Sequence, residues 1–148
     1  MYQRILVPVD GSACADRGLS EAIALAKLTG ARIRLVHVID EPFVAMGADG
    51  AVGACADLIS LARETAQRVL ADATETVKRA GIPVDHVLLD TFDGRLCELV
   101  VDAASAWSAD LVVIGTHGRR GVGRMLLGSD AEQVLRLSPV PVLLVRHE

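Results

Sequence analysis

The sequence predicts an α/β fold: a single doubly wound, five-stranded parallel sheet with helices on both faces. Five short apolar runs have the length and the Val, Ile and Leu content of strands buried on both sides. Segments with helical periodicity separate these runs, as they do between the strands of a parallel sheet. Such crossovers are right-handed and place helices on both faces. A length of 148 residues fits one domain, which we expect to span residues 1–148.

The first half of the chain is expected to hold two strands and two helices. Residues 5–9 form the first apolar run, and Asp10-Gly11-Ser12 ends it. Apolar residues spaced three and four apart then predict a helix that Gly30 closes as C-cap. Residues 33–39 are the second predicted strand. Residues 40–55 have many small residues and no period, which favours an ordinary loop over a flap that closes on a ligand.

A long amphipathic helix follows this connection, and Gly81 and Pro83 end it. Its apolar face is expected to consist of Leu58, Ala62, Ala66, Val69, Ala73, Val77 and Ala80.

The second half continues the alternation. Residues 84–89 are the third predicted strand, and Asp93-Gly94 opens a third helix. The apolar face of that helix comprises Leu96, Leu99, Val100, Ala103 and Trp107, and we interpret the tryptophan as a core residue. The fourth strand covers residues 111–115, the fourth helix about 130–137, and the last strand runs from Val140 to Val145.

A glycine-rich stretch, residues 115–129 (GTHGRRGVGRMLLGS), lies between the fourth strand and the fourth helix. Its five glycines let the backbone take positive φ and approach a ligand closely. Arg119, Arg120 and Arg124 add positive charge, with no acidic residue between them. Backbone N–H groups, guanidinium groups and a helix N-terminus together are typical of a phosphate site.

A plain structural loop is the alternative for this stretch. Ser129 and Glu132 fit the S-x-x-E capping box, in which the serine caps its own helix. Glycines between a strand and a helix are also ordinary turn residues. Spacing and charge by themselves leave both interpretations open.

The predicted topology places both motifs at one edge of the sheet. Ligands of doubly wound sheets bind beyond the carboxyl ends of the strands, where the strand order reverses. Asp10-Gly11-Ser12 and the glycine-rich stretch both follow such ends. Residues 10 and 115 come together if the first and fourth strands are neighbours.

Composition excludes several classes of protein. No apolar run approaches the roughly 18 residues of a membrane span. A net charge of −4 and an aromatic content of 3% argue against a nucleic-acid binder. Cys14, Cys55 and Cys97 are widely spaced, which argues against disulfides and zinc and favours buried thiols. The chain begins with a strand and no signal peptide, so we expect a cytoplasmic protein.

These residues resemble the universal stress protein family. The resemblance is carried by the opening ILVPVDGS, the five-strand alternation and the spacing Gly115-x2-Gly118-x9-Gly128-Ser129, and it covers the whole chain. In that family the glycine spacing marks the ATP-binding branch. The resemblance implies the adenine nucleotide alpha hydrolase-like fold, a Rossmann-like sheet with strand order 3-2-1-4-5. It also implies a homodimer.

The resemblance implies a role for individual residues. Asp10 would lie near the ribose and phosphates and help hold Mg²⁺, although a carboxylate there also fits an N-cap of the first helix. Val38 would read the adenine edge with its backbone. The loop from Gly115 would wrap the ribose, and Gly128 and Ser129 would hold the terminal phosphates, with Ser129 as second metal ligand. The complete implied nucleotide site is Pro8, Val9, Asp10, Val38, Ile114, Gly115, Thr116, His117, Gly118, Arg119, Gly128, Ser129 and Asp130.

The roles of five residues of the loop region stay open. The arginines either screen a triphosphate or form a solvated loop face. His117 has no identifiable nucleophile or carboxylate partner in the sequence, which favours an ordinary loop residue over a general base. Asp130 departs from the small or hydroxyl residue that the family commonly has there, and an inward carboxylate would repel phosphate.

The leading hypothesis is a stress-response module that binds ATP, with Mg²⁺, and is not a fast enzyme. The sequence lacks the G-x-x-x-x-G-K-[ST] motif, and its two lysines, Lys27 and Lys78, lie on predicted helices away from the loop. A slow ATP hydrolase and a nucleotide-independent dimeric interaction module are the alternatives. The apolar last strand, Val140 to Val145, is expected at the sheet edge, where it would pair with its two-fold mate.

Overall fold

The structure of the chain is a computed structural model that describes residues 1–39, 52–90, 94–117 and 128–146. Strands and helices alternate along the chain. In order they are β1 (Arg4–Pro8), α1 (Ala13–Thr29), β2 (Arg32–Ile39), α3 (Val52–Arg79), β3 (Val84–Asp90), α4 (Leu96–Ala106), β4 (Leu111–Gly115), α5 (Ser129–Leu137) and β5 (Val142–Val145).

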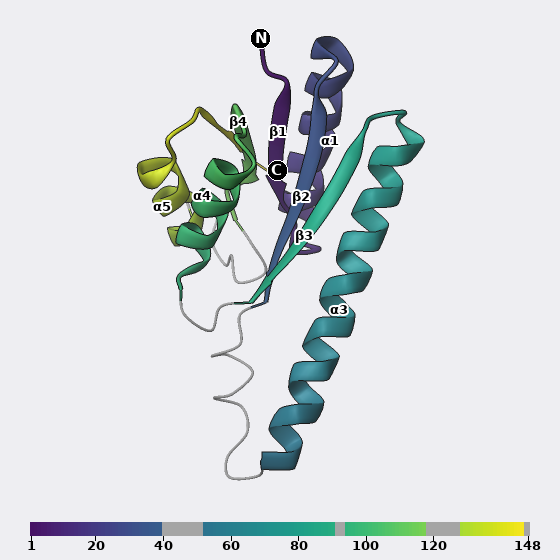
Figure 1. The fold of residues 1–148 in the computed structure, drawn as a ribbon, viewed down its shortest axis with the longest axis vertical. Helices are drawn as coiled ribbons and strands as arrows, with labels where there is room; N and C mark the ends of the chain where they lie inside the picture. Colours follow the sequence, from purple (N-terminus) through teal and green to yellow (C-terminus); the bar gives the residue numbers. More distant parts are fainter. Residues whose placement is uncertain (40–51, 91–93, 118–127, 147–148) are drawn as a thin grey trace.

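The five strands form one parallel sheet in the order β3-β2-β1-β4-β5, which confirms the predicted fold and strand order. Ile5 of the central strand lies opposite Ile33 of β2 and Leu111 of β4. Helices α1 and α3 cover one face of the sheet, and α4 and α5 cover the other (Figure 1).

Each face of the sheet packs into its own hydrophobic cluster. Ile5 and Val7 point into the cluster beneath α1 and α3, and Leu6 between them points into the cluster beneath α4 and α5. All three side chains have no exposed surface. A strand buried on both faces therefore has apolar residues at every position, which is why β1 reads as a continuous apolar run.

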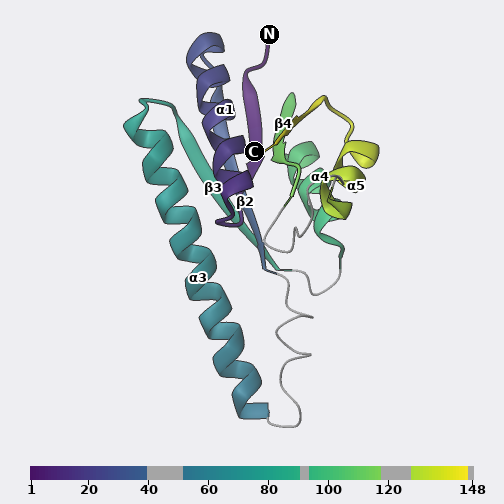
Figure 2. The same ribbon diagram turned by 180° about the vertical axis from the view of Figure 1, so that it is seen from behind.

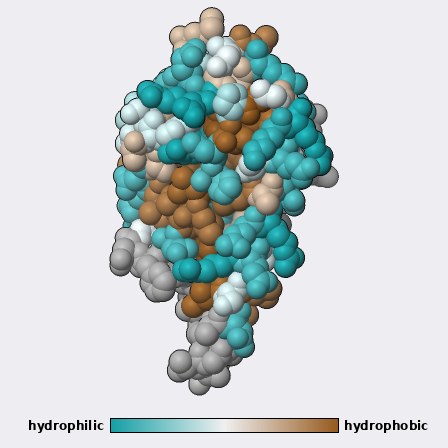
Figure 3. Space-filling model, turned by 45° about the vertical axis from the view of Figure 1, so that its right-hand side comes forward, coloured by the Kyte–Doolittle hydropathy of each residue, from teal (hydrophilic) through white to brown (hydrophobic). Residues whose placement is uncertain are grey.

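Helix α3 is longer than predicted and begins at Val52. Its second half packs on the sheet and buries Ala66, Leu70 and Val77. Its first half extends past the carboxyl ends of the strands (Figures 1 and 2). Leu58, which belongs to the predicted apolar face, is therefore 37% exposed, and Leu61 is 55% exposed. Hydrophobic surface is visible in the middle of this side of the molecule (Figure 3).

The last strand is shorter than predicted and begins at Val142. The Ser138 hydroxyl donates to the carbonyl of Val140 (2.8 Å), which holds residues 138–140 in a turn. At the end of α1, Gly30 is the predicted C-cap, since its φ of 73° is left-handed and its N–H donates to the Ala26 carbonyl.

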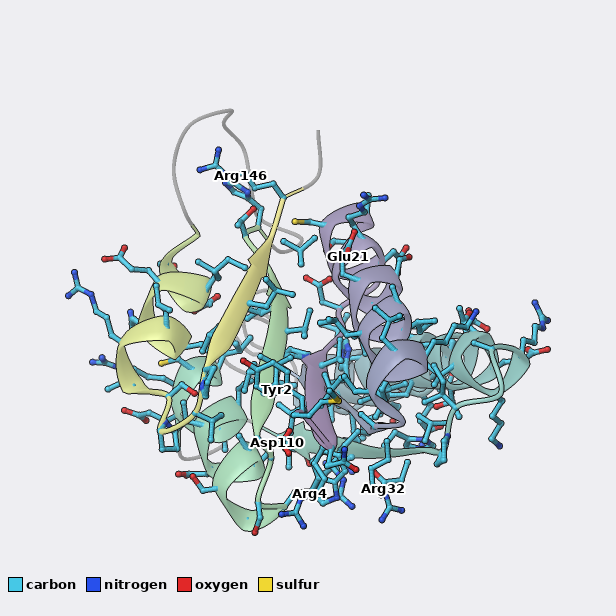
Figure 4. The ribbon with its side chains drawn as sticks, turned by 90° about the horizontal axis from the view of Figure 1, so that it is seen from above. Tyr2, Arg4, Glu21, Arg32, Asp110 and Arg146 are labelled. Carbon is cyan, nitrogen blue, oxygen red and sulfur yellow. The ribbon has the colours of Figure 1, made fainter. Side chains whose placement is uncertain are left out.

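Polar contacts fasten the amino-terminal edge of the sheet. The Asp110 carboxylate accepts from the N–H groups of Gln3 (2.8 Å) and Arg4 (3.0 Å). Arg4 and Asp110 are both labelled in Figure 4, which looks down on this end of the molecule. On β2, the Arg34 guanidinium donates to both Asp85 oxygens at 2.6 and 2.7 Å.

Trp107 lies beneath the Arg34 guanidinium, whose carbon is 4.7 Å from the ring centroid. The tryptophan is partly buried and packs against the cluster beneath α4 and α5, so it lies at the margin of the core. Cys14 and Cys97 are buried and free, as predicted, and the side chain of Cys55 lies outside the described residues. Within the described ranges, no helix is long and apolar enough to cross a membrane.

Candidate functional site

The carboxyl ends of β1 and β4 lie next to each other, because these two central strands pair. This is the point where the strand order reverses: β1 connects outward to β2, and β4 connects outward to β5. Crevices at such points bind ligands in doubly wound sheets. The predicted meeting of residues 10 and 115 at one edge is therefore confirmed.

A tight turn after β1 fixes the orientation of Asp10. One carboxylate oxygen of Asp10 accepts from the Ser12 N–H at 2.8 Å, the geometry of an Asx-turn. Gly11 has a φ of 76°, a conformation that favours glycine. Helix α1 is capped by Ser12, whose hydroxyl accepts from the Ala15 N–H at 3.2 Å. The alternative of Asp10 as N-cap is therefore wrong, since Asp10 holds the cap residue instead.

Helix α1 lies very close to the end of β4. A Cβ on Gly115 would stand 2.8 Å from the carbonyl oxygen of Cys14, and one on Gly18 would touch the Gly115 backbone at 3.4 Å. Gly115 has no positive φ. This glycine is thus required by the packing of α1 on β4, a reason that differs from the expected approach to a ligand.

Thr116 joins three segments of the site and is only 4% exposed. Its N–H donates to the Val145 carbonyl and its carbonyl accepts from the Gly128 N–H, both at 2.8 Å. Its hydroxyl lies 3.8 Å from the sulfur of Cys14. These contacts hold the end of β4, the end of β5 and the start of α5 together.

Helix α5 begins at an N-cap residue that has no side chain of its own. Its N-cap is Gly128, with a φ of −59° and a ψ of 142°, and Ser129 is already the first helical residue. The capping box predicted for Ser129 and Glu132 is therefore wrong. A glycine N-cap has no side chain to bond to the first turn of α5, so the cap residue itself leaves the N–H donors there available for an anion.

Both polar residues at the start of α5, Ser129 and Asp130, are exposed. A solvent-exposed Asp130 repels a bound phosphate less than a buried one would, because water screens its charge. A Cβ on Gly128 would stand 2.8 Å from the Thr116 carbonyl oxygen, so this glycine too is required by the backbone that it packs against.

The remaining predicted residues that the structure describes lie at the same edge. Pro8 ends β1, Val9 follows it and is buried, and Ile114 is buried near the end of β4. Val38 lies near the end of β2 and packs against the cluster beneath α4. Gly118 and Arg119, together with Arg120 and Arg124, lie outside the described residues, so their predicted roles stay predictions.

His117 is half-buried, and its Nδ1 lies 3.1 Å from the Thr116 hydroxyl. The Thr116 hydroxyl is itself buried, so this side of the His117 ring faces the protein and not a substrate. The contact supports a loop role for His117 over general-base catalysis. Across the part of the chain that is described, no group of three or more His, Cys, Asp and Glu side chains could hold a metal ion. Of the two predicted metal ligands, Asp10 lies at the end of β1 and Ser129 at the start of α5.

Sequence reasoning missed His37 on β2. This histidine is 6% exposed, and its Nδ1 lies 2.7 Å from the Val9 carbonyl oxygen at the base of the site. The available signal was a histidine inside the apolar second half of the strand, one residue before Val38.

Comparison with known proteins decides the family. A model of the universal stress protein family matches residues 1–146. This chain belongs to the universal stress protein family.

Individual universal stress proteins are similar over nearly the whole chain. One from Methanocaldococcus jannaschii is 32% identical over 147 residues, which cover 99% of this chain and 83% of that protein. The solved structure of hypothetical protein MJ0577 has a TM-score of 0.87 and 28% identity and covers 100% of this chain and 98% of its own. A universal stress protein from Archaeoglobus fulgidus, solved in complex with dAMP, has a TM-score of 0.71 and 25% identity. The match covers 97% of this chain and 98% of that chain.

Proposed function

We propose that this universal stress protein binds an adenine nucleotide, ATP with Mg²⁺, as a regulatory module of the stress response. The observation that carries the proposal is the convergence of the Asp10 turn and the uncapped start of α5 on the switch point between β1 and β4. The relative from Archaeoglobus fulgidus, solved in complex with dAMP, supports the choice of an adenine nucleotide.

The described residues fit the parts of such a ligand. The Asp10 carboxylate is held in place by the Ser12 N–H and is suited to accept from a ribose hydroxyl. The uncapped N–H groups of α5 and the Ser129 hydroxyl are suited to phosphate oxygens, because the helix dipole favours negative charge there. Asp10 and Ser129 supply the hard oxygen ligands that Mg²⁺ prefers, and the ion would offset the charge of Asp130.

We further propose that turnover is slow or absent, so that the protein acts as a binding module. P-loop enzymes transfer phosphoryl groups with a lysine that reaches the phosphates, and this sequence lacks the G-x-x-x-x-G-K-[ST] motif that supplies it. Lys27 and Lys78 lie in the last turns of α1 and α3, at the amino-terminal edge and away from the site. Phosphate release from ATP at about 1 per second or faster would contradict this.

The test of binding is calorimetric titration of ATP with Mg²⁺ into the purified protein. Wild type is expected to bind with micromolar affinity, and Asp10→Ala to bind at least tenfold more weakly. Asp16→Ala is the matched control, since Asp16 is an exposed carboxylate in the first turn of α1 and belongs to no predicted site. Absence of binding by wild type, or equal losses in both variants, would refute the proposal.

We also propose a homodimer formed through β5. This strand lies at the edge of the sheet and leaves Leu143 38% exposed. Unpaired apolar edges invite association, and pairing with a two-fold mate satisfies the free backbone groups. Sedimentation is the test: we expect a dimer at micromolar protein, and a monomer would refute the proposal.

A further inference from the structure

The pairing of β1 with β2 ends in an unusual way at the floor of the proposed site. The regular register runs from Arg4 opposite Arg32 to Pro8 opposite Val36. One further ladder bond follows, from the Val9 N–H to the Val36 carbonyl at 2.8 Å. In a continuing parallel ladder, the Val9 carbonyl would accept next from the N–H of Val38.

The Val9 carbonyl instead lies 2.7 Å from Nδ1 of the buried His37 ring. A carbonyl oxygen only accepts, so Nδ1 carries the proton in this hydrogen bond. Among the hydrogen bonds of the described residues, none runs from Val38 to Val9. The imidazole of His37 thus occupies the acceptor that the Val38 N–H would otherwise use.

The consequence concerns the backbone of Val38. Alternate residues of β2 direct their backbone groups toward β1, and the Val36 carbonyl, which accepts from Val9, identifies the even-numbered residues as that set. The N–H and C=O of Val38 therefore face the space beyond the end of β1, where the chain turns away at Asp10. The Val38 N–H can donate to adenine N1, and the Val38 C=O can accept from the adenine N6 amino group, so the pair matches this edge of the base.

We propose that His37 is a positioning residue that selects the base: by satisfying the Val9 carbonyl, it keeps the Val38 N–H out of the ladder and available for adenine N1. This inference rests on the proposed nucleotide binding and adds the group that sets its base preference. Without the imidazole, the buried Val9 carbonyl would take the Val38 N–H, because an unsatisfied buried carbonyl is costly.

The test compares ATP with inosine triphosphate, which carries a proton at N1 and cannot accept there. Wild type is expected to prefer ATP, and His37→Leu to reduce the ratio of the two affinities by about threefold to tenfold, the worth of one neutral hydrogen bond. His37→Asn is expected to retain the ratio, because its amide can donate from near the Nδ1 position.

Thr74→Val is the matched control. Thr74 is a buried polar residue of α3, the helix that packs on the sheet, and its hydroxyl lies 3.1 Å from Nδ1 of His86. This variant removes a buried polar contact away from the site, so it should lower stability without changing the ATP preference. A purely structural role for His37 would weaken both nucleotides equally, and that result would overturn the inference.

Amide hydrogen exchange of the wild type without nucleotide is a second measurement that does not depend on any variant folding. The Val38 N–H is expected to exchange at least about tenfold faster than the ladder-bonded N–H of Val36. Equal protection of the two amides would overturn the inference. Failure of the proposed function and failure of this inference give different results. Wild type that binds neither nucleotide refutes the proposed function. An ATP preference that survives in His37→Leu refutes only the role of His37.

Discussion

Replacing Gly128 with alanine should damage both stability and nucleotide binding. Gly128 is the N-cap of α5, and its N–H donates to the Thr116 carbonyl at 2.8 Å. An added Cβ would stand 2.8 Å from that same oxygen. Its φ of −59° and ψ of 142° suit alanine well, so any effect of the substitution comes from the steric clash.

The size of the effect follows from that distance. Carbon and carbonyl oxygen normally approach to about 3.3 Å, so the two backbones must separate by roughly 0.5 Å. Such overpacking costs about 1–3 kcal/mol, which corresponds to a fall in Tm of about 3–10 °C for a chain of this size. The start of α5 moves by a similar distance away from the proposed phosphate position, and we expect ATP affinity to fall by about tenfold.

Thermal unfolding and calorimetric titration with ATP measure the two effects. Gly30→Ala is the matched control, because Gly30 has a φ of 73° and no atom within 4 Å of its added Cβ. That variant should lose about 1 kcal/mol or more through backbone strain alone and keep wild-type affinity, since it lies at the far end of α1. A Gly128→Ala protein with the stability and affinity of wild type would refute the packing argument for α5.

Two other predictions concern charge and assembly. The hydrogen bonds from Arg34 lower the pKa of Asp85, so the ion pair stabilises the fold above the unfolded-state pKa of about 3.9, and this contribution is lost as the pH falls through the lowered folded-state value. Asp85→Asn should therefore reduce the free energy of unfolding at pH 7 by only about 1 kcal/mol, since the carboxylate side chain is 39% exposed. Urea titrations should show that the difference between the variant and wild type shrinks below about pH 4. A difference independent of pH would contradict this. Leu143→Lys should place a charge on the exposed edge strand and shift sedimentation toward monomer, whereas an unchanged dimer would point to another interface.

The sheet was predictable from the sequence because a strand that is buried on both faces has a continuous run of apolar residues. Leu6 faces one cluster and Val7 the other, so the run has no polar interruption. Gly30 was predictable for a similar reason, since a left-handed C-cap favours one residue type.

Details that depend on neighbouring elements were not predictable. Periodicity identified the apolar face of α3 but carries no information on where the sheet ends, so it did not predict that Leu58, on that face, is 37% exposed. At the start of α5, Ser129 matches a capping motif, yet the contact of Gly128 with Thr116 sets the boundary one residue earlier.

The candidate site was predictable only in part. Asp10 was identified from its place after β1, but its hydrogen bond to the Ser12 N–H requires the turn to be seen. His37 was missed because its partner, the Val9 carbonyl, is a backbone atom and leaves no mark in the sequence.

The most direct test of the central claim is to map backbone amide chemical shifts of the protein as ATP with Mg²⁺ is added. We expect the largest changes at the carboxyl edge, in residues 9–12, 38, 115–117 and 128–131. Residues at the opposite edge, such as Arg4 and Asp110, should barely change. Changes confined to that edge or to α3, or none at millimolar nucleotide, would contradict the claim that the switch point between β1 and β4 is a nucleotide site.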